Sequence, residues 1–134
     1  MSLPQMGNGV DERSTPLVLF NPLHERHQFT LDAAASVERH LLPRFCTLGG
    51  TADTDEGGVI YAIHPCDGLT FPWAGERVWF NPPYSRGSLE PFVRKAFDRE
   101  AAIAVGLLPV RTEQPWFHRY VWDRERMHPY QGVT

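Results

Sequence analysis

The chain has little of the chemistry that marks secreted, membrane or metal-binding proteins. Its two cysteines, Cys46 and Cys66, and the absence of any Cys-x-x-Cys favour reduced thiols in a cytoplasmic protein over a disulfide framework. No stretch of about 18 apolar residues is present to cross a bilayer, and no basic segment followed by an apolar one predicts a secretory signal. His24 and His27 lack the further partners that a zinc site needs, so no metal site is predicted.

Lysine is also scarce, and the positive charge is spread unevenly. Residues 1–75 hold four Arg and nine acidic residues, a net charge of −5, whereas residues 76–134 hold eight Arg, one Lys and seven acidic residues, a net charge of +2. Arginine binds phosphate bidentately better than lysine does. The second half therefore favours a nucleic-acid partner mildly, although an ordinary solvated surface gives similar counts.

The length of 134 residues predicts a single domain, and a hydrophobic content of 42% is enough to form a core. Residues 1–14 are polar and are expected to be a flexible lead-in to one domain over residues 15–134. Thr15 before Pro16 suits the N-cap of a helix with proline in its first turn. Because Pro22 limits its continuation, we expect a short helix or two half-helices ending at His27.

The apolar pattern of the remaining chain predicts alternating strands and helices. We expect strands over residues 29–32, 59–63, 77–80 and 102–108, with helices over 33–42 and 89–97 and a last helix that begins after Thr112 and carries Trp116, Phe117, Tyr120 and Val121. This order of elements predicts a small three-layer α/β domain with a mostly parallel sheet.

The most informative motif is Asn81-Pro82-Pro83-Tyr84, directly after the apolar run Val78–Phe80. The two prolines lack N–H groups and fix φ, so the turn is stiff and its carbonyls point outward. Asn81 offers an acceptor oxygen and two donors, and Tyr84 offers a flat ring. Such a turn suits a planar amino group, which needs acceptors in its plane and a ring above it. A proline-rich turn that merely closes a strand is the alternative.

Three predicted strand ends carry polar or small residues, namely Asp32, Asn81–Tyr84 and Pro109–Thr112. In a parallel sheet these ends lie at one edge, and ligands of open α/β sheets bind at that edge. Their convergence favours the functional interpretation of the Asn81 turn over the structural one.

The ordered set of segments resembles the phage-type DNA N6-adenine methyltransferases, which use S-adenosylmethionine. The resemblance covers roughly residues 14–122 and is carried by Ser14–Pro16, Phe29–Ser36, Val78–Ser85, Leu107–Thr112 and Trp116–His118. It implies a small three-layer Rossmann-like methyltransferase fold with a mostly parallel sheet. The chain departs from the family in being short at its C-terminus, where family members usually continue with another strand pair. The resemblance also implies location in the cytoplasm of a host cell if the gene belongs to a phage or prophage.

The resemblance also implies roles for individual residues. In that family the Asn oxygen and the next carbonyl accept the two amino protons, and the aromatic residue stacks on the base. Asn81, Pro82 and Tyr84 would then be catalytic and hold the target adenine. The implied cofactor-binding residues are Thr15, Pro16, Asp32, Ala33, Ala34 and Asn81. Asp67 could contact the cofactor adenosine or start a turn, and we favour the turn.

The implied partner is DNA, with Arg86 and Arg111 as the expected phosphate contacts. Cytosine N4 or a protein glutamine amide presents a similar amino group, so both stay open as substrates, as does an inactive relative that only binds nucleic acid. Alanines stand after Asp32, where most methyltransferases have glycines. The strand over residues 102–108 is expected to be an open edge, covered by residues 127–134 or by a second chain.

Overall fold

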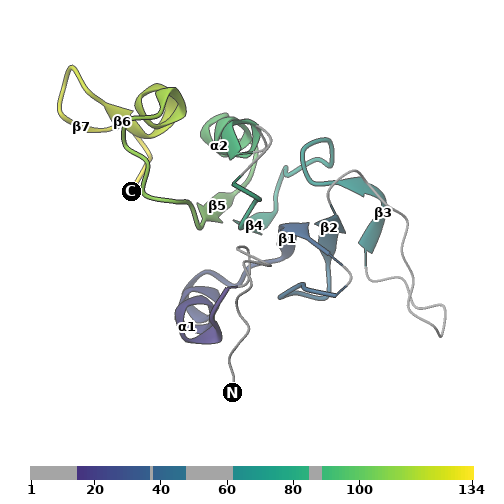
Figure 1. Cartoon of the computed structure of the whole chain (residues 1–134). Helices are drawn as coiled ribbons and strands as arrows, with labels where there is room; N and C mark the ends of the chain where they lie inside the picture. Colours follow the sequence, from purple (N-terminus) through teal and green to yellow (C-terminus); the bar gives the residue numbers. More distant parts are fainter. Residues whose placement is uncertain (1–14, 37, 48–61, 85–88) are drawn as a thin grey trace, which may run out of the picture.

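A five-stranded sheet in which every neighbouring pair is parallel forms the centre of the molecule (Figure 1). The computed structural model describes residues 15–36, 38–47, 62–84 and 89–134. The strand order is β3-β2-β1-β4-β5, so the direction of the chain across the sheet reverses between β1 and β4. The strands are β1 (Leu31–Ala35), β2 (Phe45–Thr47), β3 (Ala62–Asp67), β4 (Arg77–Phe80) and β5 (Ile103–Gly106).

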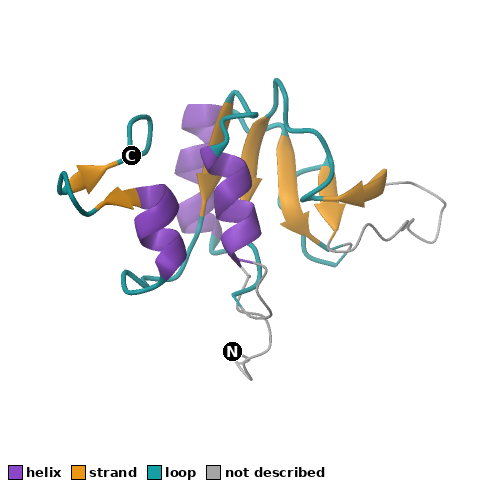
Figure 2. Ribbon diagram, turned by 90° about the horizontal axis from the view of Figure 1, so that it is seen from above, coloured by secondary structure: helices purple, strands orange, loops and turns teal. Residues whose placement is uncertain are grey.

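Helices cover both faces of this sheet (Figure 2). Helix α1 (Leu17–His27) packs on one face and α2 (Leu89–Phe97) on the other. The chain continues past β5 into the π-helix η1 (Phe117–Val121) and the antiparallel pair β6 (Trp122–Asp123) and β7 (His128–Pro129). None of the described helices is long and apolar enough to span a membrane.

The alternation of side chains along β4 explains the three layers. Val78 and Phe80 point to the α2 face, where Phe80 and Phe92 stack with ring centroids 6.1 Å apart. Trp79 points to the α1 face and meets the edge of Phe20 at 5.2 Å. Successive residues of a strand face opposite sides, so an unbroken apolar run is what a strand buried on both faces requires. The predicted small, parallel, Rossmann-like α/β fold is therefore confirmed.

Several expected elements are confirmed with shifted ends. Helix α1 runs without a break through Pro22 to His27, and α2 matches its predicted range. The expected strand over 102–108 is the shorter β5, and the last helix is η1. The strand expected over 59–63 is seen from Ala62 onward, while residues 59–61, like residues 1–14, lie outside the described part of the chain.

Three local predictions are wrong. The Ala33–Ala35 segment is part of β1, and the described residues after it form bends up to Arg44 instead of a helix. The strand β2 was not expected at all. Thr15 does not cap α1, because Pro16 occupies the N-cap and no side chain caps the helix. In addition, Cys46 in β2 is disulfide-bonded, so the expectation of reduced thiols is wrong.

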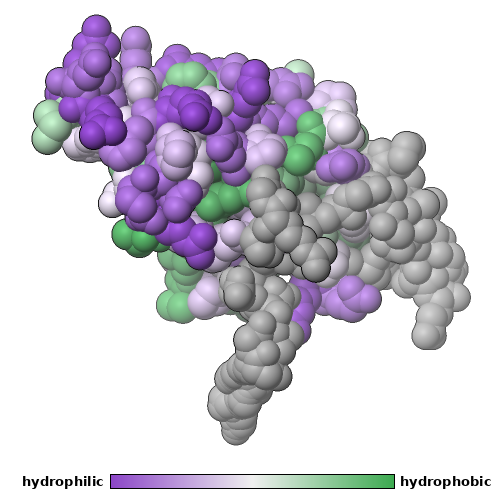
Figure 3. All heavy atoms as spheres, turned by 45° about the horizontal axis from the view of Figure 1, so that its top comes forward, coloured by the Kyte–Doolittle hydropathy of each residue, from purple (hydrophilic) through white to green (hydrophobic). Residues whose placement is uncertain are grey.

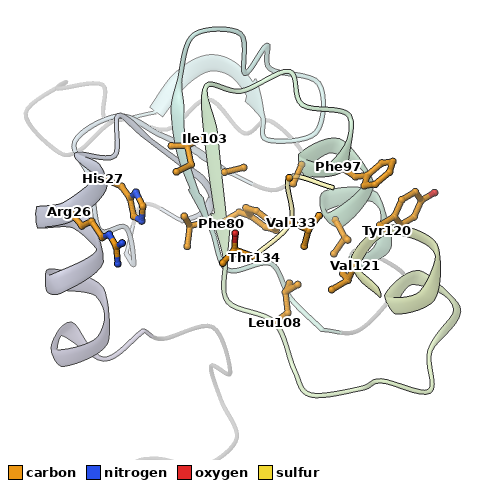
Figure 4. A pocket seen from close by; sticks show the side chains of 16 residues that line it. Arg26, His27, Phe80, Phe97, Ile103, Leu108, Tyr120, Val121, Val133 and Thr134 are labelled. Carbon is orange, nitrogen blue, oxygen red and sulfur yellow. The ribbon is translucent and has the colours of Figure 1, made fainter. Parts of the chain in front are cut away.

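The outer edge of β5 faces a cavity of about 510 Å³ (Figure 4). Its walls are the strand itself, apolar side chains of α2 and η1, the segment Gly132–Thr134, and Arg26 and His27 at the end of α1. The segment lines the cavity without forming a strand beside β5 within the described residues. The expected covering of this edge by residues 127–134 is thus present in part, and self-association stays a prediction.

A network of hydrogen bonds ties the amino ends of three strands together. Arg44, just before β2, donates to both carboxylate oxygens of Glu76, at 2.8 and 2.9 Å, and to the carbonyl of Thr30 at 3.0 Å. The hydroxyl of Thr30 donates to Glu76 at 2.7 Å. The Arg44 hydrogen bond, more than any other cause, lowers the pKa of Glu76 below its ordinary value of 4.5.

We expect Glu76→Gln to lower the free energy of unfolding at neutral pH by about 1–2 kcal/mol, because a charge-assisted pair with a half-exposed arginine is lost. A carboxyl whose pKa is lower when folded contributes stability above its unfolded pKa and loses it as the pH falls through the folded one. The difference between wild type and variant should therefore shrink at acid pH in urea titrations. Glu125→Gln, on an exposed residue, is the control, and an equal effect there would contradict the role of the network.

Candidate active site

The carboxyl ends of β1 and β4 meet where the strand order reverses. Leu31 pairs with Val78 and Asp32 with Trp79, so the last residues of β1 lie beside Phe80 and the turn after it. The crevice outside the carboxyl ends at such a switch point is the usual ligand site of open α/β sheets. The predicted convergence of the β1 and β4 ends at one edge is confirmed.

Asn81 begins the turn at this point and is joined to a segment far away in sequence. Its side chain is 3% exposed, and its Nδ2 donates a hydrogen bond of 3.0 Å to the hydroxyl of Thr15. Pro16, which follows Thr15, starts α1: its carbonyl accepts hydrogen bonds from the backbone N–H groups of Leu19 and Phe20, both at 3.0 Å. The contact brings together two segments that sequence reasoning had placed separately in the site. It also fixes the amide with its donor toward Thr15.

The remainder of the turn is held by packing. Pro82 is fully buried, and Tyr84 is half-buried in a cluster with Leu89, Val93 and Trp116. This cluster connects the turn to α2 and η1, and Trp116 is a buried core residue in it. The ring of Tyr84 therefore lies beside the start of α2 and packs against buried apolar side chains.

Asp32 has a structural contact in this arrangement. It lies inside β1 and is buried, and its Oδ2 accepts a hydrogen bond of 2.9 Å from the backbone N–H of Leu41. Its own N–H donates to the carbonyl of Arg44 at 3.1 Å. Asp32 thus holds the bends after β1 against the sheet, so it does not lie in a turn at the strand end as expected.

Ala33 and Ala34 are also buried strand residues, and a close backbone contact of Ala33 explains why the residue opposite it is a glycine. A Cβ built on Gly68 would lie 1.8 Å from the carbonyl oxygen of Ala33, so the turn after β3 crosses β1 in direct backbone contact. Sequence reasoning missed Gly68, whose only local signal is the Asp67-Gly68 turn. The preference for a turn at Asp67 is confirmed, because its Oδ1 accepts from the N–H of Leu69 at 2.9 Å.

Arg111 lies on the exposed loop that leaves the carboxyl end of β5. Since β5 is parallel to β4, this loop belongs to the same edge as Asn81. Among the ion pairs of the described residues, none involves Arg111. Arg86 lies outside the described residues.

A parallel sheet in this strand order defines a Rossmann-like α/β domain, and the polar groups at its switch point lie where ligands of such domains usually bind. The chain belongs to the DNA N-6-adenine-methyltransferase (Dam) family, whose family model matches residues 7–127. Comparison with curated proteins and with solved structures found no match. Membership of this family implies a methyl-donor cofactor and a DNA substrate in general terms.

Proposed function

We propose that the protein transfers a methyl group from S-adenosylmethionine to the N6 amino group of adenine in DNA. The observation that carries the proposal is the buried Asn81 at the β1–β4 switch point, held by its 3.0 Å hydrogen bond to Thr15. Family membership over residues 7–127 supports the same reaction.

The chain's own groups would bind and orient the adenine amino group. The side-chain oxygen of Asn81 and the carbonyl of Pro82 would accept its two protons, which stabilises the positive charge that develops on the nitrogen. Stacking on Tyr84 would contribute about 1–3 kcal/mol, against the few kcal/mol that it costs to take a base out of the duplex. This chemistry needs placement of acceptors and no strong base.

The cofactor would supply the activated methyl group. Thr15 and Pro16 would meet its methionine end from one side, and the β1 segment with Asp32, Ala33 and Ala34 from the other. What supports this placement is the composition of the junction, where the Thr15 hydroxyl and Asn81 amide are polar and the β1 side chains are small. Asp32, which binds the Leu41 N–H, would act by keeping β1 and its following bends in place.

The test is methyl transfer from labelled cofactor to unmethylated DNA, followed by analysis of the nucleosides. N6-methyladenine is the expected product. Label found in N4-methylcytosine would show that cytosine is the substrate instead of adenine. Label found in a protein glutamine would show that the substrate is a protein amide. Cofactor and DNA binding without any transfer would identify a binding protein instead of an enzyme.

DNA binding should depend on salt, and Arg111 should account for part of that dependence. Each phosphate contact contributes a slope of about −0.9 in a plot of log K against log salt concentration. Arg111→Ala is expected to weaken binding and to reduce the slope by about one, measured by fluorescence anisotropy. Arg86→Ala is expected to act in the same way.

The matched control is Arg124→Ala. Hydrophilic residues gather over the end of the molecule formed by η1 and the β6–β7 hairpin (Figure 3), where Arg124 is exposed. There Arg119 pairs with Glu90 and Arg126 with Asp123, which reduces the local positive charge. If Arg124→Ala changed the slope as much as Arg111→Ala did, the proposed phosphate contact of Arg111 at the edge of the site would be contradicted.

A further inference from the structure

Exposed large apolar side chains gather at the edge of the candidate site. Five are exposed among the described residues, and four of them belong to this edge: Leu17, Val18, Leu19 and Val110. The first three directly follow the Thr15-Pro16 segment that contacts Asn81. Single exposed apolar residues are ordinary, but four on the two segments that adjoin one site indicate that this surface meets a partner.

Val110 is the most exposed of the set, at 94%. Phe80 pairs with Gly106, and the N–H of Leu107 donates to the carbonyl of Phe80 at 3.0 Å, so residue 107 lies beside the start of the Asn81 turn. Three further residues span at most roughly 11 Å. Val110 is therefore held close to the site and projects into solvent.

The loop that carries Val110 is fixed on both sides. Leu107 packs on the α1-side cluster and Leu108 on the α2-side cluster, and Pro109 restricts the backbone just before Val110. After the loop, the carbonyl of Arg111 accepts from the N–H of Gln114 at 3.2 Å, and Trp116 is buried. A valine has a stiff side chain with one χ angle, so little entropy is lost when it inserts into a partner.

We infer that Val110 is the positioning residue that opens the duplex, by entering the base stack where the target adenine leaves it. This inference rests on the proposed methylation of adenine in DNA. An adenine inside a duplex cannot reach the site without leaving the stack. Proteins that open base steps insert apolar side chains between the bases. The exposed guanidinium of Arg111, the next residue, suits the phosphate beside the opened step.

The experiment compares two duplexes that carry the methylated sequence found for the wild-type protein, one with the target adenine paired and one with it mispaired. A mispaired base leaves the stack at lower cost. Val110→Ala is expected to lower kcat/KM on the paired duplex about tenfold or more, because unstacking one step is costly and the shorter side chain offsets less of that cost, and to stay within about twofold of wild type on the mispaired one. Val110→Leu, which keeps an apolar side chain, should restore activity on the paired duplex.

Met127→Ala is the matched control, because Met127 is 70% exposed but belongs to the β6–β7 hairpin, beyond η1 from the site (Figure 1). It should leave both rates unchanged. If Val110→Ala lost activity equally on the two duplexes, or on neither, the role of Val110 in opening the duplex would be overturned while the proposed function stands. A wild-type protein that forms no N6-methyladenine would overturn both the proposed function and the proposed role of Val110.

Discussion

Asn81→Ala is expected to lower the rate of methyl transfer about 100-fold or more, on the scale of one oriented hydrogen bond lost from the transition state. Binding of S-adenosylmethionine, measured by calorimetry, should weaken far less than methyl transfer does, although Asn81 also adjoins the proposed cofactor segment. The substitution removes the acceptor oxygen proposed to hold the adenine amino group. It also removes the amide that donates to Thr15 at 3.0 Å, so the two contributions have to be separated.

Two further variants separate them. Asn81→Asp keeps acceptor oxygens at the same position and loses the donor, so it should retain far more activity than Asn81→Ala. Thr15→Val removes the hydroxyl that fixes the amide, and we expect a loss of about tenfold, the value of one ordinary hydrogen bond. Because Thr15 is also proposed to meet the cofactor, the rates are compared at saturating S-adenosylmethionine. If Thr15→Val and Asn81→Ala lost activity equally, Asn81 would matter only for joining the two segments.

The parts of the fold that the sequence predicts are those with a local signal. The apolar spacing of residues 89–97 and the unbroken run Val78–Phe80 reflect burial that each segment undergoes by itself, and both become the expected elements, α2 and β4. The turn after β4 follows in the same way, because the prolines of Asn81–Tyr84 end the strand. These elements place the candidate site at the correct edge of the sheet.

The failed predictions concern residues whose conformation depends on distant partners. Alanine favours helices, yet the Ala33–Ala35 segment is a strand because it lies between β2 and β4 and is buried on both faces. Strand β2 has only three residues, too few for a pattern. The hydrogen bond between Thr15 and Asn81 joins residues 66 positions apart. Local sequence rules therefore predict a helix cap at Thr15 and cannot predict this contact.

Gly68 is the other position that only the tertiary structure explains, and it carries the largest expected effect on stability. Gly68→Ala should lower the free energy of unfolding by about 3 kcal/mol, the upper end of the usual cost of overpacking. The new methyl group would lie 1.8 Å from the carbonyl oxygen of Ala33 and 3.2 Å from the ring of Phe92. The turn has little freedom to retreat, because the Gly68 carbonyl accepts a hydrogen bond of 3.0 Å from the buried Trp73 indole.

Gly75→Ala is the control for this substitution, measured in the same urea titrations. Gly75 has a φ of +75°, and a Cβ at this residue would meet nothing within 4 Å, so alanine there should cost only the strain of the left-handed backbone, about 1–2 kcal/mol. Because the contact of Gly68 is with β1, its replacement should also weaken cofactor binding at temperatures where the variant is still folded, whereas Gly75→Ala should not. Equal destabilisation by the two substitutions, with cofactor binding intact in both, would mean that the turn after β3 can move away from β1 and does not shape the site.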